Sequence, residues 1–221
     1  MYTVKPLPEA IPHALLQRLL LAQPATIGHT LHEGFMDTGI TTYFETARVV
    51  GTAVTVQAPN LDGAIVHYAM GQTRPGDVLV VDRCGDNRHA CIGGAMAYAA
   101  RAAGLAGIIV DGPVTDLLEL REYGVPVWSR GLSPITCKTL GIGGSFCLPV
   151  SCGGVSVTPG DAIFADVNGI LVLKREQIES AVERAIYLQE AEKVTLSRMD
   201  KGEKYPDILG STAVVMSKLS S

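Results

Sequence analysis

One stretch, from Cys91 to Glu122, constrains the fold more than any other part of the chain. A pair of glycines precedes a run of small residues, which predicts a helix over 94–104. Three apolar residues, 108–110, predict a buried strand, and a tight turn is expected over 111–113 before the next helix begins. This alternation of helix and strand is typical of α/β folds, in which ligands bind at the ends of the strands.

Two features of this stretch point to a site for an anion and a metal ion. Gly93 and Gly94 let a ligand approach the backbone because they carry no Cβ, and the following helix presents free N–H groups and the positive end of its dipole. Asp116 adds a hard oxygen ligand of the kind that suits Mg²⁺ or Mn²⁺. The alternative interpretation is that Thr115 and Asp116 only cap the next helix, since both residue types are common caps.

Length and composition limit the classes of protein to which the chain can belong. Its 221 residues fit one large domain or two small ones, and we expect one. The net charge of −4 argues against a nucleic-acid partner, because nucleic-acid binding usually needs a basic face. The five cysteines form no CxxC pair, which favours free thiols in a reducing cytoplasm. We expect neither a signal peptide nor a membrane partner, because the sequence shows no leader pattern and no apolar stretch of spanning length.

The remaining elements are expected to surround the central stretch. Strands are predicted over 47–57, 78–81, 125–128 and, as three short strands, within 150–173, and helices over 11–22, 25–34, 61–71 and 174–203. The segment 129–147 shows no clear element and is interpreted as a binding loop, a subunit contact or edge strands. A single domain over 1–221 would then comprise N-terminal helices in 1–35, a C-terminal helix in 174–204 and a loosely held tail over 205–221.

Histidines outside the central stretch are candidate metal ligands or catalytic groups. His29, His32 and Glu33 suggest a metal cluster, but the two histidines are three residues apart and no further ligand has a clear spacing. A surface or interface role is therefore favoured over a metal site. His67 lies among apolar neighbours in the sequence, and we interpret it as a packed histidine rather than a catalyst.

The polar loop 82–90 directly precedes the Gly-Gly turn and follows a buried strand. Loops in this position often carry function. Arg83, Arg88 and His89 could supply positive charge or a proton to an anionic ligand. The alternative, which the sequence leaves open, is an ordinary solvated loop.

Five phrases of the sequence resemble the RraA-like family, which includes the class II 4-hydroxy-4-methyl-2-oxoglutarate/4-carboxy-4-hydroxy-2-oxoadipate aldolases and the regulator of ribonuclease E activity A. The phrases are VVGTAVTV (49–56), RPGDVLVVD (74–82), GGAMAYAARAAGLAGIIVDGPVTD (93–116), GVPVW (124–128) and GGVSVTPGDAIFADVNGILVL (153–173). They follow the family's order. The resemblance implies a layered β/β/α fold of the swivelling phosphohistidine-domain type. It also implies homotrimers or homohexamers with sites at subunit interfaces.

The resemblance also implies roles for residues of the central stretch. In the aldolases, the backbone amides of a Gly-Asp-Leu-Leu-type turn bind the pyruvyl carboxylate. That turn matches Gly93, Gly94, Ala95 and Met96. Further along, an Arg-Asp pair completes the site: the arginine binds substrate and stabilises the enolate, and the aspartate binds a divalent metal ion, usually Mg²⁺. The matching positions are Thr115 and Asp116.

Two residues depart from the aldolase pattern. Gly94 stands where the aldolases usually have an acid, which removes a water-mediated metal contact. Thr115 stands where arginine is expected, and a hydroxyl cannot replace a planar, permanently charged guanidinium. Losing such a donor costs about 3–4 kcal/mol, or roughly 10²–10³ in rate. Either another cation replaces it, with Arg83, Arg88 and Arg130 as candidates, or the substrate differs, or aldol cleavage has been lost.

The activity implied by the resemblance is that of a metal-dependent lyase acting on a small 2-oxo acid. The reaction would be aldol cleavage of a 4-hydroxy-2-oxo acid or decarboxylation of oxaloacetate to pyruvate, with Mg²⁺ or Mn²⁺ as cofactor. Two alternatives remain at this point. One is another metal-dependent reaction on a related organic acid, and the other is a non-catalytic regulator that binds a ribonuclease.

Overall fold

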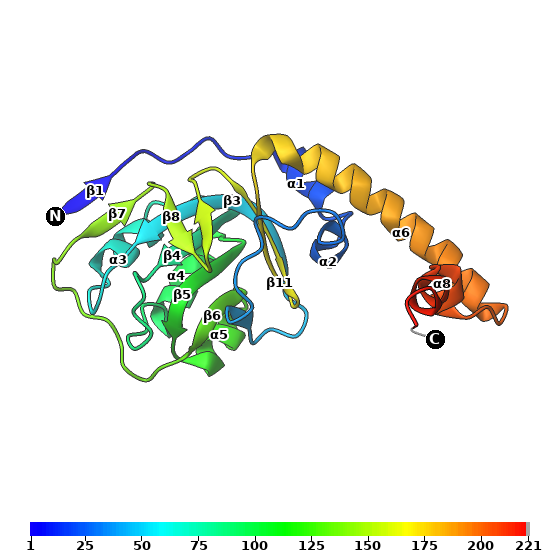
Figure 1. Ribbon diagram of the computed structural model, residues 1–221. Helices are drawn as coiled ribbons and strands as arrows, with labels where there is room; N and C mark the ends of the chain where they lie inside the picture. Colours follow the sequence, from blue (N-terminus) through cyan, green and yellow to red (C-terminus); the bar gives the residue numbers. More distant parts are fainter. Residues whose placement is uncertain (220–221) are drawn as a thin grey trace.

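A nine-stranded sheet forms the centre of the computed structural model, which describes residues 1–219 (Figure 1). The strands are β1 (Tyr2–Val4), β2 (Thr41–Thr42), β3 (Arg48–Gln57), β4 (Asp77–Asp82), β5 (Gly107–Val114), β6 (Val127–Leu132), β7 (Gly144–Phe146), β10 (Ala162–Asp166) and β11 (Gly169–Leu173). The main path is β1-β7-β3-β4-β5-β6-β2, and the β10–β11 hairpin joins it through β3. Strands β3 to β6 run parallel, which places their carboxyl ends at one edge of the sheet.

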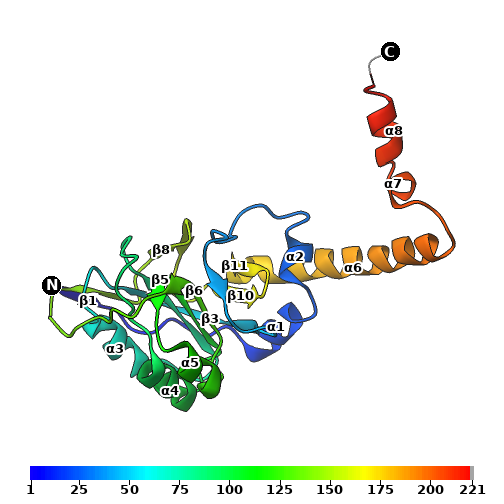
Figure 2. The same ribbon diagram turned by 90° about the horizontal axis from the view of Figure 1, so that it is seen from below.

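The central strands are buried on both faces, which explains their continuous apolar runs. In β4, Leu79 and Val81 face a layer of helices, whereas Val78 and Val80 face the opposite side. The helices of this layer are α3 (Ala64–Met70), α4 (Gly94–Ala103) and α5 (Leu117–Tyr123), which lie together on one side of the sheet (Figure 2). The other face is covered by the hairpin of β8 (Val150–Cys152) and β9 (Val155–Val157), so the layers follow the order β/β/α.

A separate hydrophobic core is formed between the N-terminal helices and elements from the last third of the chain. Helices α1 (His13–Leu19) and α2 (Pro24–Ile27) pack with the β10–β11 hairpin and the first half of α6 (Ile178–Asp200). A 3₁₀ turn, η1 (Arg175–Gln177), precedes α6. The second half of α6 extends away from the body of the protein and leads into α7 (Tyr205–Ile208) and α8 (Ser211–Met216), as Figures 1 and 2 show. No helix among residues 1–219 combines the length and apolarity needed to cross a bilayer.

Two predictions about individual elements were wrong. The helix predicted over 25–34 is only the four-residue α2, because the chain must return to the sheet, where Phe35 forms a bridge with Leu171. The turn predicted over 111–113 lies inside β5, where the register with β6 shifts between Val110 and Pro113. The tail from 205 contains two short helices without buried residues, and the segment 129–147 contributes the end of β6 and all of β7, which fits the edge-strand alternative for this segment.

The buried carboxylate of Asp62 fastens the start of α3 to two distant segments. It accepts hydrogen bonds from the backbone N–H groups of Ala64 (3.0 Å), Leu140 (3.1 Å) and Ile142 (2.7 Å). It also accepts one from the hydroxyl of Tyr2 (2.8 Å). Burial alone would raise the pKa of Asp62, but these donors stabilise the ionised form more strongly, and the pKa lies well below its ordinary value.

The low pKa of Asp62 predicts a specific dependence of stability on pH. Because the folded-state pKa is depressed, this contribution is complete above the unfolded-state pKa of about 4 and declines as pH falls below it. We expect Asp62→Asn to lower the free energy of unfolding by about 2–3 kcal/mol at pH 7. Urea unfolding should show a smaller difference between wild type and variant at pH 3. Equal differences at both pH values would contradict this account.

Candidate functional site

The Gly-Gly turn lies at the amino end of α4 and allows a close approach by the segment that follows β5. Gly93 is extended, with φ of −144°, and α4 begins at Gly94. A Cβ on Gly93 would lie only 2.5 Å from Oδ2 of Asp116 and 2.8 Å from Cγ2 of Thr115. A Cβ on Gly94 would lie 3.0 Å from Cβ of Glu119. The first glycine is therefore needed because any side chain there would displace Asp116.

Asp116 is turned toward the Gly-Gly pair. Its Oδ2 accepts a hydrogen bond from the N–H of Gly94 at 2.9 Å, and the hydroxyl of Thr115 lies 3.3 Å from its Oδ1. The backbone of Thr115 is held by a 2.9 Å hydrogen bond from its N–H to the carbonyl of Ile92. Although Asp116 precedes α5, its side chain makes no capping hydrogen bond to that helix. The simple capping interpretation is therefore wrong for this carboxylate.

The backbone of Asp116 is left-handed, with φ of 55° and ψ of 48°. Few residues other than glycine adopt this conformation, although Asp and Asn tolerate it best. Residues held in such sparsely populated regions gather at functional sites. This backbone conformation points the carboxylate toward the amino end of α4 rather than along α5.

A cavity of about 140 Å³ opens beside this contact. Its lining contains all six residues that the sequence predicted for the site: Gly93, Gly94, Ala95, Met96, Thr115 and Asp116. The other lining residues are His67, Ala90, Cys91, Thr136 and Cys137. The structure thus brings the predicted residues together around an open space.

His67 was wrongly interpreted as a packed side chain. It is exposed and lines the cavity from the last turn of α3. The buried residues of this helix are Ile65, Val66, Ala69 and Met70. Their spacing leaves position 67 on the outer face, so helical periodicity was the signal that could have identified it.

Neither Arg83 nor Arg130 is available to the cavity as a free cation. Arg83 is fully buried behind the cavity wall. Its guanidinium donates to the carbonyl oxygens of Ala58 (2.8 Å), Asn60 and Asp62, to the carboxylate of Asp86 (3.2 Å) and to Sγ of Cys137 (3.2 Å). Arg130 is held by the carboxylates of Asp111 and Asp37. Neither of these arginines is among the cavity's lining residues, and the exposed Arg88 is also absent from that set within the described chain.

The two thiols of the cavity are neutral at physiological pH. Burial raises the pKa of Cys91 to about 12 and also raises the pKa of Cys137. A neutral thiol is a poor nucleophile and a poor metal ligand. The thiols therefore add no charge to the cavity, where the carboxylate of Asp116 lies beside the partial positive charge at the start of α4.

The ligand set suits a hydrated hard cation. Within residues 1–219, no group of three or more His, Cys, Asp or Glu side chains is arranged to hold a metal ion. Mg²⁺ commonly binds through one or two carboxylates and fills its other positions with water and substrate oxygens. Asp116 beside an open cavity fits that mode, whereas a structural zinc site would need four protein ligands. His29, His32 and Glu33 likewise form no metal-ligating group.

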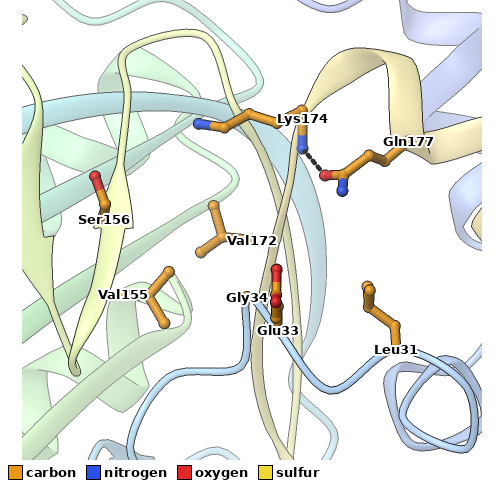
Figure 3. A pocket seen from close by; sticks show the side chains of 8 residues that line it. All are labelled: Leu31, Glu33, Gly34, Val155, Ser156, Val172, Lys174 and Gln177. Carbon is orange, nitrogen blue, oxygen red and sulfur yellow. Dashed lines mark hydrogen bonds between the residues drawn. The ribbon is translucent and has the colours of Figure 1, made fainter.

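A second cavity, of about 210 Å³, shares no lining residue with the cavity beside Asp116, and Figure 3 shows the residues around it. It is lined by Leu31, Glu33, Gly34, Val155, Ser156, Val172, Lys174 and Gln177. The ammonium group of Lys174 is paired with Asp161 at 2.7 Å, and Gln177 accepts a hydrogen bond from the Lys174 backbone N–H at 2.8 Å. Because Asp161 balances the charge of Lys174, this cavity offers no uncompensated cation to an anionic ligand.

Comparison with known proteins agrees with this architecture. The RraA-like (Aldolase/RraA) family profile matches residues 26–172. A protein of Halalkalibacterium halodurans named "Putative 4-hydroxy-4-methyl-2-oxoglutarate aldolase" is 38% identical over 141 residues, which cover 64% of this chain and 67% of that protein.

Two solved structures share both sequence and fold with this chain. Streptomyces coelicolor RraAS2, described as an unusual member of the RNase ES inhibitor RraA family, is 30% identical with a TM-score of 0.77. The match covers 87% of this chain and 99% of RraAS2. The RNA-processing inhibitor RraA from Thermus thermophilis is 30% identical with a TM-score of 0.63, covering 69% of this chain and 93% of RraA. The chain therefore belongs to the RraA-like family.

Proposed function

We propose that the protein is a divalent-metal-dependent lyase that releases pyruvate from a small 2-oxo acid. The observation that carries the proposal is the 2.9 Å contact between Asp116 and the Gly94 N–H at the mouth of an open cavity. This contact places a carboxylate next to the amino end of a ten-residue helix. A cation ligand and an anion-binding backbone are thus adjacent, as a chelating 2-oxo carboxylate requires.

The chain's own groups divide the binding of such a substrate between them. Ala95 and Met96 lie in the first turn of α4, where an α-helix leaves N–H groups without intrahelical acceptors. Their amides would bind the substrate carboxylate, and the hydroxyl of Thr115 would donate to a neighbouring substrate oxygen. Asp116 would hold Mg²⁺ or Mn²⁺, which supplies a Lewis acid for the electron pair released when the C–C bond breaks.

Two reactions need an acceptor for the electron pair that is released when the C–C bond breaks. In aldol cleavage of a 4-hydroxy-2-oxo acid, the hydroxyl loses its proton, the C3–C4 bond breaks, C4 becomes a carbonyl carbon and C3 becomes part of a pyruvate enolate. In decarboxylation of oxaloacetate, the same bond breaks and carbon dioxide leaves. In both reactions a proton added at C3 completes pyruvate, so a site that stabilises the enolate serves either reaction.

Metal-dependent pyruvate formation tests the proposal. Purified protein is assayed with 4-hydroxy-4-methyl-2-oxoglutarate and with oxaloacetate, coupled to lactate dehydrogenase. We expect EDTA to abolish turnover and added Mg²⁺ or Mn²⁺ to restore it, because the electron pair would otherwise have no acceptor. Pyruvate formation that is absent, or that is unchanged by EDTA, would rule the proposal out.

A ribonuclease-binding role is the second candidate. It is favoured by the 30% identity to RraAS2, a member of the RNase ES inhibitor family, and by threonine at position 115. This role predicts that the protein co-purifies with an RNase E-type enzyme and reduces RNA cleavage without turning over any 2-oxo acid. The two outcomes of the pyruvate assay therefore separate the candidates.

A further inference from the structure

In the proposed function, the cavity lining that comes from α3 and from the segment around Cys137 binds neither the metal ion nor the 2-oxo carboxylate. This wall contains His67 from α3 and the segment that carries Cys137. A Cβ built on Gly63 would lie 3.8 Å from Nε2 of His67 and 3.0 Å from Cβ of Cys137. The imidazole and the thiol-bearing segment therefore converge over this glycine, which leaves room for both.

This wall is held in place by backbone hydrogen bonds. The N–H of Gly63 donates to the carbonyl of Lys138 at 2.8 Å, and the N–H of Cys137 donates to the carbonyl of Ala90 at 2.9 Å. Arg83 supports the wall from behind through its 3.2 Å contact with Sγ of Cys137. His67 thus projects from a fixed support, although its own side chain is exposed.

Among residues 1–219, His67 is the one side chain lining this cavity that can carry a positive charge. The other lining residues are glycine, alanine, methionine, threonine, cysteine and Asp116, and both thiols are neutral. The cavity of about 140 Å³ has the volume of four or five waters, which suits a small acid. A substrate whose 2-oxo carboxylate is bound at the start of α4 occupies the same cavity that His67 lines.

We propose that His67 binds the distal carboxylate of the substrate and thereby favours aldol cleavage over decarboxylation. The inference rests on the proposed lyase function. Its physical basis is that the distal carboxylate keeps its charge in aldol cleavage and loses it in decarboxylation. In aldol cleavage the distal carboxylate keeps its charge throughout, so His67 binds substrate and transition state equally. In decarboxylation that carboxylate becomes carbon dioxide, so the same contact stabilises the ground state more than the transition state.

The replacement His67→Gln distinguishes the effect on aldol cleavage from the effect on decarboxylation in the same protein. With 4-hydroxy-4-methyl-2-oxoglutarate we expect KM to rise about tenfold or more and kcat to stay constant, because a uniform binding contact is lost. With oxaloacetate we expect KM to rise and kcat to increase, because the leaving carboxylate is no longer held in its charged form. Steady-state kinetics with saturating Mg²⁺ on both substrates measures all four parameters.

Two further variants make the result specific. His67→Lys places an ammonium donor at this position and should return KM for the aldol substrate toward the wild-type value. His29→Gln changes an exposed histidine that does not line the cavity and should leave all four parameters unchanged. Circular dichroism confirms that each variant is folded.

The outcomes distinguish this inference from the function on which it rests. Wild-type turnover combined with an unchanged KM in His67→Gln would overturn the role of His67 and leave the lyase proposal standing. An equal fall of kcat and kcat/KM on both substrates would also overturn it, since that pattern marks a contact made only in the transition state. Absence of wild-type turnover with either substrate overturns both proposals.

Discussion

Replacing Asp116 with asparagine is expected to reduce metal-dependent pyruvate formation at least about 100-fold while the protein stays folded. Asparagine has nearly the same shape and tolerates the left-handed backbone found at this position, with φ of 55°. Its amide oxygen can still accept the hydrogen bond from Gly94 that Oδ2 accepts at 2.9 Å. The substitution therefore removes the negative charge and little else.

The matched control for this variant is Glu122→Gln. Glu122 is an exposed carboxylate on the adjacent helix α5 and does not line the cavity, so its replacement makes the same change in net charge. Titration with Mn²⁺, followed by electron paramagnetic resonance, should show loss of the bound ion in Asp116→Asn only. An Asp116→Asn protein that binds Mn²⁺ and turns over substrate as the wild type does would exclude the metal role.

Much of the sheet was predictable because its central strands are buried on both faces. The predicted strand 47–57 is β3, and the predicted strand 78–81 lies within β4. Both carry apolar or β-branched runs bounded by turn residues, and neither faces water. The Asn168-Gly169 signal correctly indicated the β10–β11 hairpin, but the turn itself is formed by Val167 and Asn168, because Gly169 already pairs with Asp166 as the first residue of β11.

The predicted turn was wrong because tertiary contacts, rather than the local sequence, determine the conformation of this segment. Asp111-Gly112-Pro113 has the composition of a turn, yet it continues β5. A Cβ on Gly112 would lie 2.6 Å from Cγ of Arg83, so the glycine serves to admit a buried side chain. The burial of Arg83 was itself unpredictable, because arginine is almost never fully buried without partners and those partners come from distant segments.

The sequence predicted six of the residues that line the candidate site, but neither their arrangement nor the part of the lining that includes His67. The resemblance indicated Gly93, Gly94 and Asp116, whereas the contact between the last two joins residues 22 positions apart and depends on the fold. Arg83 was a reasonable candidate for a replacement cation from sequence alone. Its carbonyl and carboxylate partners, visible only in the structure, explain why it supports the cavity wall instead of facing the ligand.

Introducing arginine at position 115 is expected to increase the rate of pyruvate formation. Thr115 lines the cavity, and its hydroxyl lies 3.3 Å from Oδ1 of Asp116, so a longer side chain at this position starts beside the carboxylate proposed to bind the metal ion. A guanidinium would offset the charge that develops on the enolate, which threonine cannot do. Preorganised donors of this kind are worth roughly 10²–10³ in rate, and we expect a gain of at least about tenfold in kcat.

The control for Thr115→Arg is Thr115→Gln, which adds length and N–H donors without positive charge. A gain confined to the arginine variant would show that the developing negative charge limits the wild-type rate. The increase should appear in kcat more than in KM, because the charge is greatest in the transition state. It should also appear for both substrates, since the aldol and decarboxylation reactions pass through the same enolate. A folded Thr115→Arg protein that still binds Mn²⁺ but shows no gain would contradict the enolate-based account, because the added cation would then meet no charge to stabilise.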